Sequence, residues 1–187
     1  RQYRDEVRAA TGRDDTEAEE TLAFVSELIA DQLYVEPIHR LYTGVSEPDL
    51  RDALEQHFDL LPIGSADSGF LGAVTAEPRL CLVTGEGTAW WLDPRPGSFA
   101  EVRPLDGLWL EHALDALAHE VRYQHGAALA LEAVRRGEAV AAALTRPVTI
   151  DEITRTAREH LLMPPKSTFF TPKLRTGFVV RPLSDGP

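Results

Sequence analysis

Lysine is nearly absent from this 187-residue chain. Seventeen of the 19 basic residues are arginine, and the two lysines are Lys166 and Lys173. Cysteine occurs once, in the apolar run from Leu80 to Val83, which excludes an internal disulfide and predicts a buried Cys81 thiol in a reducing, cytoplasmic setting. No apolar run reaches roughly 18 residues, so no membrane span and no membrane partner are expected.

Positive charge is scarce as well. The formal net charge is −11 and the pI is near 5.0, whereas nucleic-acid-binding domains usually carry a basic footprint, so no nucleic-acid partner is expected. The charge is unevenly spread: residues 1–162 hold 15 basic and 29 acidic side chains, but residues 163–187 hold four and one. A cationic strip on an acidic protein is a candidate anion site, because its local field opposes the global one.

Apolar periodicity and turn residues predict an irregular alternation of helices and strands. This pattern favours an α+β fold, with a mixed, largely antiparallel sheet and packed helices. The predicted helices cover residues 1–10, 46–58, 106–119, 127–136 and 149–162, and the predicted strands cover 22–29, 33–42, 59–63, 79–84, 88–92, 121–123, 139–144 and 177–183.

Three local signals support individual elements. Gly85 and Gly87 predict a hairpin turn. Thr149 and Glu152 form the pattern of a capping box, which opens a helix. Pro37 predicts that its strand lies at a sheet edge or a bulge, because proline cannot donate to a ladder.

The chain starts at Arg1 with a helical pattern and no capping residue before it. We therefore expect residues 1–187 to be one C-terminal region of a longer protein. Whether this region folds alone is left open, and a homo-oligomer is a candidate assembly.

The cationic strip supplies the best candidate anion ligands. Lys166 can act as a point charge on a phosphate, and the hydroxyl groups of Ser167 and Thr168 can donate hydrogen bonds to it. Lys173 follows seven residues later and could share the same anion if the loop doubles back. No glycine-rich run precedes Lys166, so the segment is not a P-loop. The alternative is a solvent-exposed loop that joins the last helix to the last strand.

Four more residues are candidates for a cleft: His39, Arg40, His125 and Arg175. His39 and Arg40 are neighbours in a predicted strand, so at most one of them faces a given cleft. His125 lies at a strand-to-helix junction, where site residues are common. Structural hydrogen bonds and salt bridges are the alternative for His39 and Arg40. No His, Cys or carboxylate spacing indicates a metal site, although His112 and His119 are predicted to share a helix face.

Residues 163–180, the signature segment, read Met-Pro-Pro-Lys-Ser-Thr-Phe-Phe-Thr-Pro-Lys-Leu-Arg-Thr-Gly-Phe-Val-Val. This segment resembles the C-terminal signature of an uncharacterised bacterial and archaeal family, domain of unknown function 1015. Shorter pieces occur in the family's order at residues 3–6, 37–40, 123–125 and 147–149. The resemblance covers essentially the whole chain.

The resemblance implies a role in phosphotransfer. Family members carry, ahead of the position of Arg1, a segment similar to one in the ParB/sulfiredoxin-like free serine kinases, and the family is associated with serine biosynthesis. That segment is not among these residues, so catalysis that depends on it cannot be assigned to them.

Two functional hypotheses follow. The first is the phosphate-anchoring half of a small-molecule, serine-type phosphotransferase, which binds a phosphorylated ligand through Lys166, Ser167, Thr168 and Lys173, with Mg²⁺ held partly by the phosphate donor. The second is a non-catalytic scaffold or binding module. Whether the two lysine side chains converge on one anion separates the hypotheses.

Overall fold

The computed structural model describes residues 1–21, 23, 25, 27, 34–66, 69–171, 177 and 179–180. The chain divides into two units: residues 1–29 with 172–187, and residues 30–171. Each unit is described by itself.

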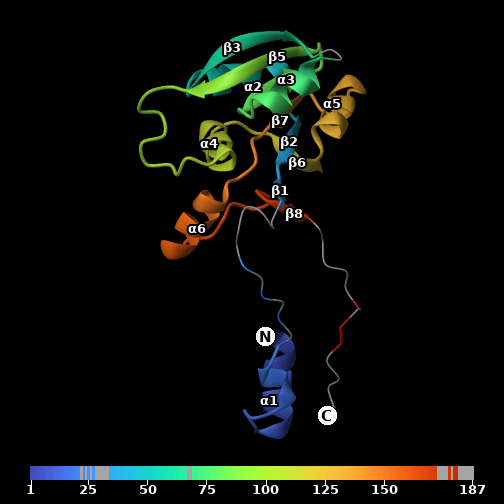
Figure 1. The fold of residues 1–187 in the computed structure, drawn as a ribbon, viewed down its shortest axis with the longest axis vertical. Coiled ribbons are helices and arrows are strands. Elements are labelled where there is room, and N and C mark those ends of the chain that lie inside the picture. The colour runs from blue at the N-terminus through green and yellow to red at the C-terminus, as the bar shows by residue number, and fades with distance from the viewer. Residues whose placement is uncertain are drawn as a thin grey trace. The chain divides into compact units, whose positions relative to one another are not determined.

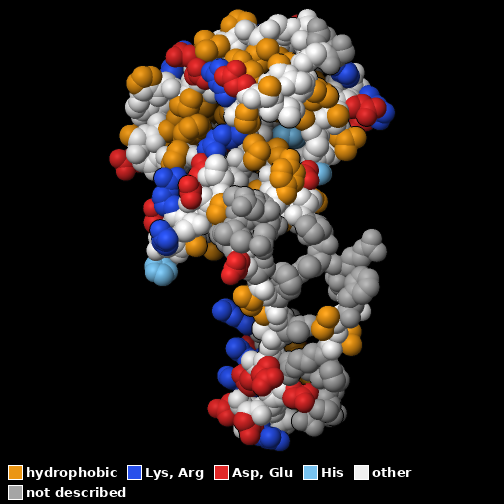
Figure 2. All heavy atoms as spheres, in the orientation of Figure 1, with side chains coloured by type: hydrophobic (Ala, Val, Ile, Leu, Met, Phe, Trp, Pro, Cys, Tyr) orange, Lys and Arg blue, Asp and Glu red, His pale blue; other side chains and the backbone are white. Residues whose placement is uncertain are grey.

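The first unit contains the helix α1 (Gln2–Thr11) and a short 3-10 helix, η1 (Glu17–Glu19). Gly12 ends α1 in the left-handed conformation that glycine adopts without strain. The guanidinium of Arg8 donates two hydrogen bonds of 2.6 Å to Glu19, which ties the two helices together. Charged side chains cover this part of the molecule (Figure 2).

The second unit is built around a six-stranded sheet (Figure 1) in which every adjacent pair is antiparallel. This sheet, with helices packed on it, confirms the predicted α+β class. Its strand order is β3-β5-β4-β7-β2-β6, and a separate two-stranded sheet pairs β1 with β8. The strands are β1 (Tyr34–Glu36), β2 (Ile38–Thr43), β3 (Phe58–Ser65), β4 (Cys81–Thr84), β5 (Thr88–Pro94), β6 (Glu120–His125), β7 (Ala141–Leu144) and β8 (Phe169–Thr171).

Helices cover both faces of the large sheet. One hydrophobic cluster joins the sheet to α2 (Glu47–Glu55) and α4 (Asp106–Ala113), and another joins it to α3 (Phe70–Ala76) and α5 (Ala127–Arg135). The last helix is α6 (Ile150–Arg158). The central strands β4 and β7 are buried along their whole length, as expected of strands packed on both faces. No described helix is long and apolar enough to cross a membrane.

Two of the three local signals proved reliable. The hairpin around Gly85 and Gly87 joins β4 to β5, and the capping box of Thr149 and Glu152 opens α6. Trp90 and Trp91 pack on opposite clusters, as strand alternation requires.

Several element boundaries differ from the prediction. The prediction for Pro37 was wrong: it precedes β2, so all of β2 can pair, and β2 lies inside the sheet between β7 and β6. The helix α2 ends at Glu55, and Phe58 begins β3. The helix α4 ends at Ala113, so His119 lies outside it. The helix α3 and the strand β8 were not predicted.

Two predicted strands cannot be compared in full. Residues 22–29 and 177–183 lie largely outside the described residues.

Candidate functional site

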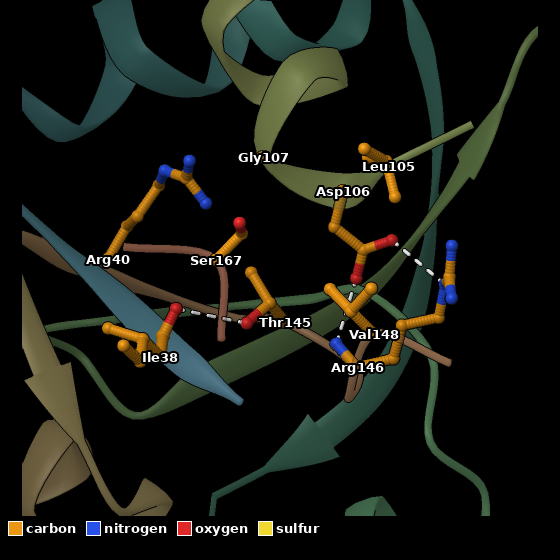
Figure 3. Close-up of a pocket in the computed structure, with 9 residues that line it drawn as sticks. All are labelled: Ile38, Arg40, Leu105, Asp106, Gly107, Thr145, Arg146, Val148 and Ser167. Carbon is orange, nitrogen blue, oxygen red and sulfur yellow. Dashed lines mark hydrogen bonds and ion pairs between the residues drawn. The ribbon is translucent and has the colours of Figure 1, made fainter. Parts of the chain in front are cut away.

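One small pocket gathers residues from distant parts of the sequence, and we call it the Arg40 pocket (Figure 3). It lies where β2 and the residues after β7 meet the start of α4. It is lined by Ile38, Arg40, Leu105, Asp106, Gly107, Thr145, Arg146, Val148 and Ser167.

Arg40 supplies a buried positive charge to this pocket. Its side chain is 3% exposed, and its guanidinium donates a hydrogen bond of 3.1 Å to Glu111, whose side chain is 48% exposed. The ring of Tyr123, directly opposite on β6, lies 5.7 Å from the Arg40 guanidinium carbon. A buried guanidinium needs compensation, and a half-exposed carboxylate provides only part of it. Arg40 therefore keeps unused hydrogen-bond donors. The cavity beside them has a volume of about 10 Å³, room for roughly one water molecule, so an anion reaches these donors only if Glu111 or the start of α4 moves.

The start of α4 forms the opposite wall. Gly107 lies so close to Arg40 that a Cβ atom at this position would stand 2.5 Å from Nη2. The preceding Leu105 offers no side-chain cap, so the first backbone amides of α4 lack that partner. Amides at a helix N-terminus favour anions. Figure 3 shows the Arg40 and Ser167 side chains pointing toward this helix end.

Asp106 and Arg146 neutralise each other on the other side of the pocket. The Asp106 carboxylate accepts a hydrogen bond of 2.8 Å from the Arg146 backbone and forms an ion pair of 3.0 Å with its side chain. Burial raises the pKa of Asp106, and the Arg146 charge opposes that shift. Arg146 also donates two hydrogen bonds to Glu152. The Arg146 side chain is thus paired with the carboxylates of Asp106 and Glu152, and Arg40 is the better candidate for binding a ligand.

The signature segment reaches the pocket through Ser167. Its hydroxyl donates a hydrogen bond of 2.7 Å to the Pro164 carbonyl, which closes a turn in which Lys166 has a positive φ of 54°. Lys166 is exposed and Thr168 is half-buried. Ser167 and Arg40 therefore lie in one pocket, with Lys166 beside it in the sequence. Lys173 and Arg175 lie outside the described residues, so the convergence of the two lysines stays a prediction.

His39 and His125 lie on opposite faces of the sheet. His39 is buried on the face opposite Arg40, where its Nδ1 accepts a hydrogen bond of 3.2 Å from the Thr145 backbone. Burial, together with a smaller effect of the nearby His125, lowers the pKa of His39 to about 4. Such a histidine is neutral and structural. His125 shares the face of Arg40, and its Nε2 hydrogen-bonds to the carboxylate of Glu36.

The other histidines do not form a metal site. His112 on α4 contacts the rings of His57 and Phe99, whereas His119 contacts Tyr42. The predicted shared face of His112 and His119 was wrong, because α4 ends between them. Among the described residues, no group of three His, Cys, Asp or Glu side chains could hold a metal ion.

Sequence reasoning identified Arg40 and Ser167 but not their proximity. Asp106, where the predicted helix 106–119 starts, is the first residue of α4, and its side chain turns toward Arg146. Gly107 and Thr145 were not identified, since neither carries a signal that separates it from an ordinary glycine or threonine.

Comparison with known proteins identifies a fold relationship. No family model matches the chain, and no curated protein does. Solved structures with a similar fold include a mutant free serine kinase in complex with AMP (TM-score 0.55, 14% identity, 79% of this chain and 58% of that one). A mutant free serine kinase in complex with ADP gives a TM-score of 0.53 at 14% identity over 80% of this chain and 58% of that one.

A conserved hypothetical protein from Pyrococcus furiosus is similar to the same degree (TM-score 0.55, 13% identity, 79% of this chain and 60% of that one). The chain spans less than two thirds of the length of each of these neighbours. At such low identity, the likeness establishes a shared fold.

Proposed function

We propose that this chain forms the phosphate-anchoring part of a small-molecule phosphotransferase, with serine or a similar hydroxyl-bearing metabolite as the acceptor. The observation that carries the proposal is the Arg40 pocket, in which a buried guanidinium, a helix N-terminus and the Ser167 hydroxyl meet. The fold likeness to free serine kinases, crystallised with AMP and ADP, supports a phosphorylated ligand.

Each group in the pocket has a distinct role in this proposal. The planar guanidinium of Arg40 binds two phosphate oxygens, as arginine does at bidentate sites. The amides at the start of α4 donate to the remaining oxygens, and the Ser167 hydroxyl donates to them after it releases the Pro164 carbonyl, because a hydroxyl has a single proton to donate. Lys166 adds a solvent-screened positive charge at the rim, and Thr168 and Lys173 stay candidates for further contacts.

Phosphoryl transfer needs positioning and charge stabilisation more than covalent chemistry from the protein. The Arg40 pocket would supply the positioning of one phosphate group. A divalent cation such as Mg²⁺ would arrive with the phosphates of the donor, which supply most of its ligands.

Glu111 gives the sharpest test, because it competes with an anion for Arg40. Glu111→Gln removes the competing charge and should strengthen pyrophosphate binding several-fold, whereas Ser167→Ala removes a donor to a charged group and should weaken it roughly tenfold. Lys166→Ala should weaken it less, since exposed charges are screened. Isothermal titration of the full-length protein with pyrophosphate, ADP and phosphoserine measures these affinities.

Glu55→Gln is the matched control for Glu111→Gln. Glu55 also lies on a helix, also forms an ion pair with an arginine, Arg51, and has the same 48% side-chain exposure. Equal effects of the two glutamate substitutions would mean that only net charge matters, and the Arg40 site would be rejected. A wild-type protein that binds none of the three ligands would also reject it.

A non-catalytic scaffold is the second candidate, and one observation favours it. Within the signature segment, β8 pairs with β1 and Phe169 packs on His125, so part of the segment has a structural role. This candidate predicts that Ser167→Ala changes stability but not ligand affinity.

A further inference from the structure

His125 connects three strands that belong to two different sheets. It is the last residue of β6, its Nε2 hydrogen-bonds to the carboxylate of Glu36 of β1, and its ring stacks on Phe169 of β8. The ring centroids of His125 and Phe169 lie 4.1 Å apart, with 25° between the ring planes. Glu36 and Phe169 are direct cross-strand partners. Each of the three residues therefore contacts the other two.

This trio lies next to the Arg40 pocket. Phe169 follows Ser167 by two residues, a separation of about 7 Å in extended chain. His125 pairs across the sheet with Ile38, which lines the pocket. Arg40 is the diagonal neighbour of His125 on the same face, at a typical Cα distance of about 7–8 Å. His125 is thus paired with a pocket residue of β2, Ile38, and Phe169 lies two residues from a pocket residue of the signature segment, Ser167.

Among the described residues, short contacts attach the signature segment near the pocket. The Ser167 hydroxyl bonds to Pro164, which belongs to the same segment, so this bond shapes the turn without attaching it to the sheet. The β1–β8 pairing spans only three residues on each strand. A two-stranded ribbon of this length is marginal without side-chain packing. The stacking of Phe169 on His125 adds such packing two residues from Ser167, so it helps to hold Ser167 near Arg40.

We propose that His125 is a positioning residue of the phosphate site, acting through Phe169 and Ser167. By binding Glu36 and stacking on Phe169, His125 holds the Lys166–Ser167 turn against the Arg40 pocket. This inference rests on the proposed function, because it assigns a role at the same site. His125 itself contacts no ligand in this account.

The test measures pyrophosphate affinity in full-length variants at a temperature where each is folded. Phe169→Leu removes the stacked ring and should weaken binding roughly three- to tenfold, the factor expected from losing an aromatic pair. Phe169→Tyr keeps the ring and should retain wild-type affinity. His125→Leu should weaken binding at least as much as Phe169→Leu, because it removes the same stack and also the contact with Glu36. The double variant should bind no more weakly than His125→Leu.

A spectroscopic signature separates positioning from a merely structural role. The ring protons of His125 lie beside the Phe169 ring, so their NMR signals should shift when pyrophosphate binds and should lose that response in Phe169→Leu. The matched control is His160→Asn, which replaces an exposed histidine with positive φ of 55° by a residue that tolerates this conformation. His160→Asn should leave affinity and the His125 signals unchanged.

The outcomes distinguish the two proposals. If the wild type binds pyrophosphate and Phe169→Leu and His125→Leu bind it equally well, the positioning role is overturned and the phosphate site stands. If the two single effects add up in the double variant, the residues act independently and the role is again overturned. If the wild type binds no phosphate compound, the proposed function fails, and this inference fails with it.

Discussion

Gly107 offers a direct way to disturb the buried guanidinium of Arg40 without removing any charge. A Cβ atom at position 107 would lie 2.5 Å from Nη2, 3.0 Å from Nη1 and 3.2 Å from Cζ of Arg40. Ordinary contacts of a Cβ atom begin near 3.4 Å, so the guanidinium must move by close to 1 Å. A shift of this size would stretch its hydrogen bond to Glu111, which is 3.1 Å long.

The expected magnitude follows from two opposing effects. Weakening a hydrogen bond between charged groups costs up to about 1.5–3 kcal/mol, less here because Glu111 is half-exposed. Replacing glycine by alanine in a helix gains up to about 1 kcal/mol. We expect Gly107→Ala to destabilise the protein by about 1 kcal/mol and to weaken pyrophosphate binding.

Gly72→Ala is the matched control. Gly72 also lies in a short helix, α3, but a Cβ atom there would meet nothing within 4 Å. This variant should be unchanged or more stable by up to about 1 kcal/mol, from helix propensity alone. Urea unfolding followed by tryptophan fluorescence measures both changes. If Gly107→Ala stabilises the protein as much as Gly72→Ala does, the close approach of Arg40 to α4 is refuted.

Two further predictions concern buried titratable groups on the sheet. Burial lowers the pKa of His39 from 6.5 to about 4. As the pH falls below 6.5, this histidine therefore binds a proton in the unfolded chain before it does so in the folded protein. The free energy of unfolding should decrease as a result until the pH reaches about 4. The free energy of unfolding falls by about 3 kcal/mol at most. Urea unfolding between pH 7 and 4.5 should show a smaller decrease for His39→Gln than for the wild type. An equally steep decrease in both proteins would contradict the assignment of this effect to His39. Burial also raises the pKa of the Cys81 thiol to about 12, so iodoacetamide at pH 8 should label Cys81 only after unfolding in urea. Rapid labelling of the folded protein, detected by mass spectrometry, would show that the β4 core is open.

Sequence patterns identified features that are determined by neighbouring residues. The capping box of Thr149 and Glu152 and the hairpin at Gly85 and Gly87 need only a few adjacent residues, and both form as expected. The burial of Cys81 was expected from the apolar run around it, and the structure confirms it. The end of α4 at Ala113 was missed, because no glycine or proline marks it.

The site could be predicted only in part, because it depends on contacts between distant residues. Arg40 and Ser167 are separated by more than a hundred residues, and no pattern along the chain indicates that they share a pocket. Gly107 is significant only because Arg40 lies against it. The error at Pro37 has a related cause: a proline blocks pairing at its own position, and β2 starts one residue later.

A crystal structure of the full-length protein with bound ADP would show whether the Arg40 pocket binds a phosphate group. We expect a phosphate group with oxygens about 3 Å from the Arg40 guanidinium and from the Ser167 hydroxyl, at the start of α4. A phosphate bound elsewhere, with the Arg40–Glu111 ion pair intact, would contradict this expectation.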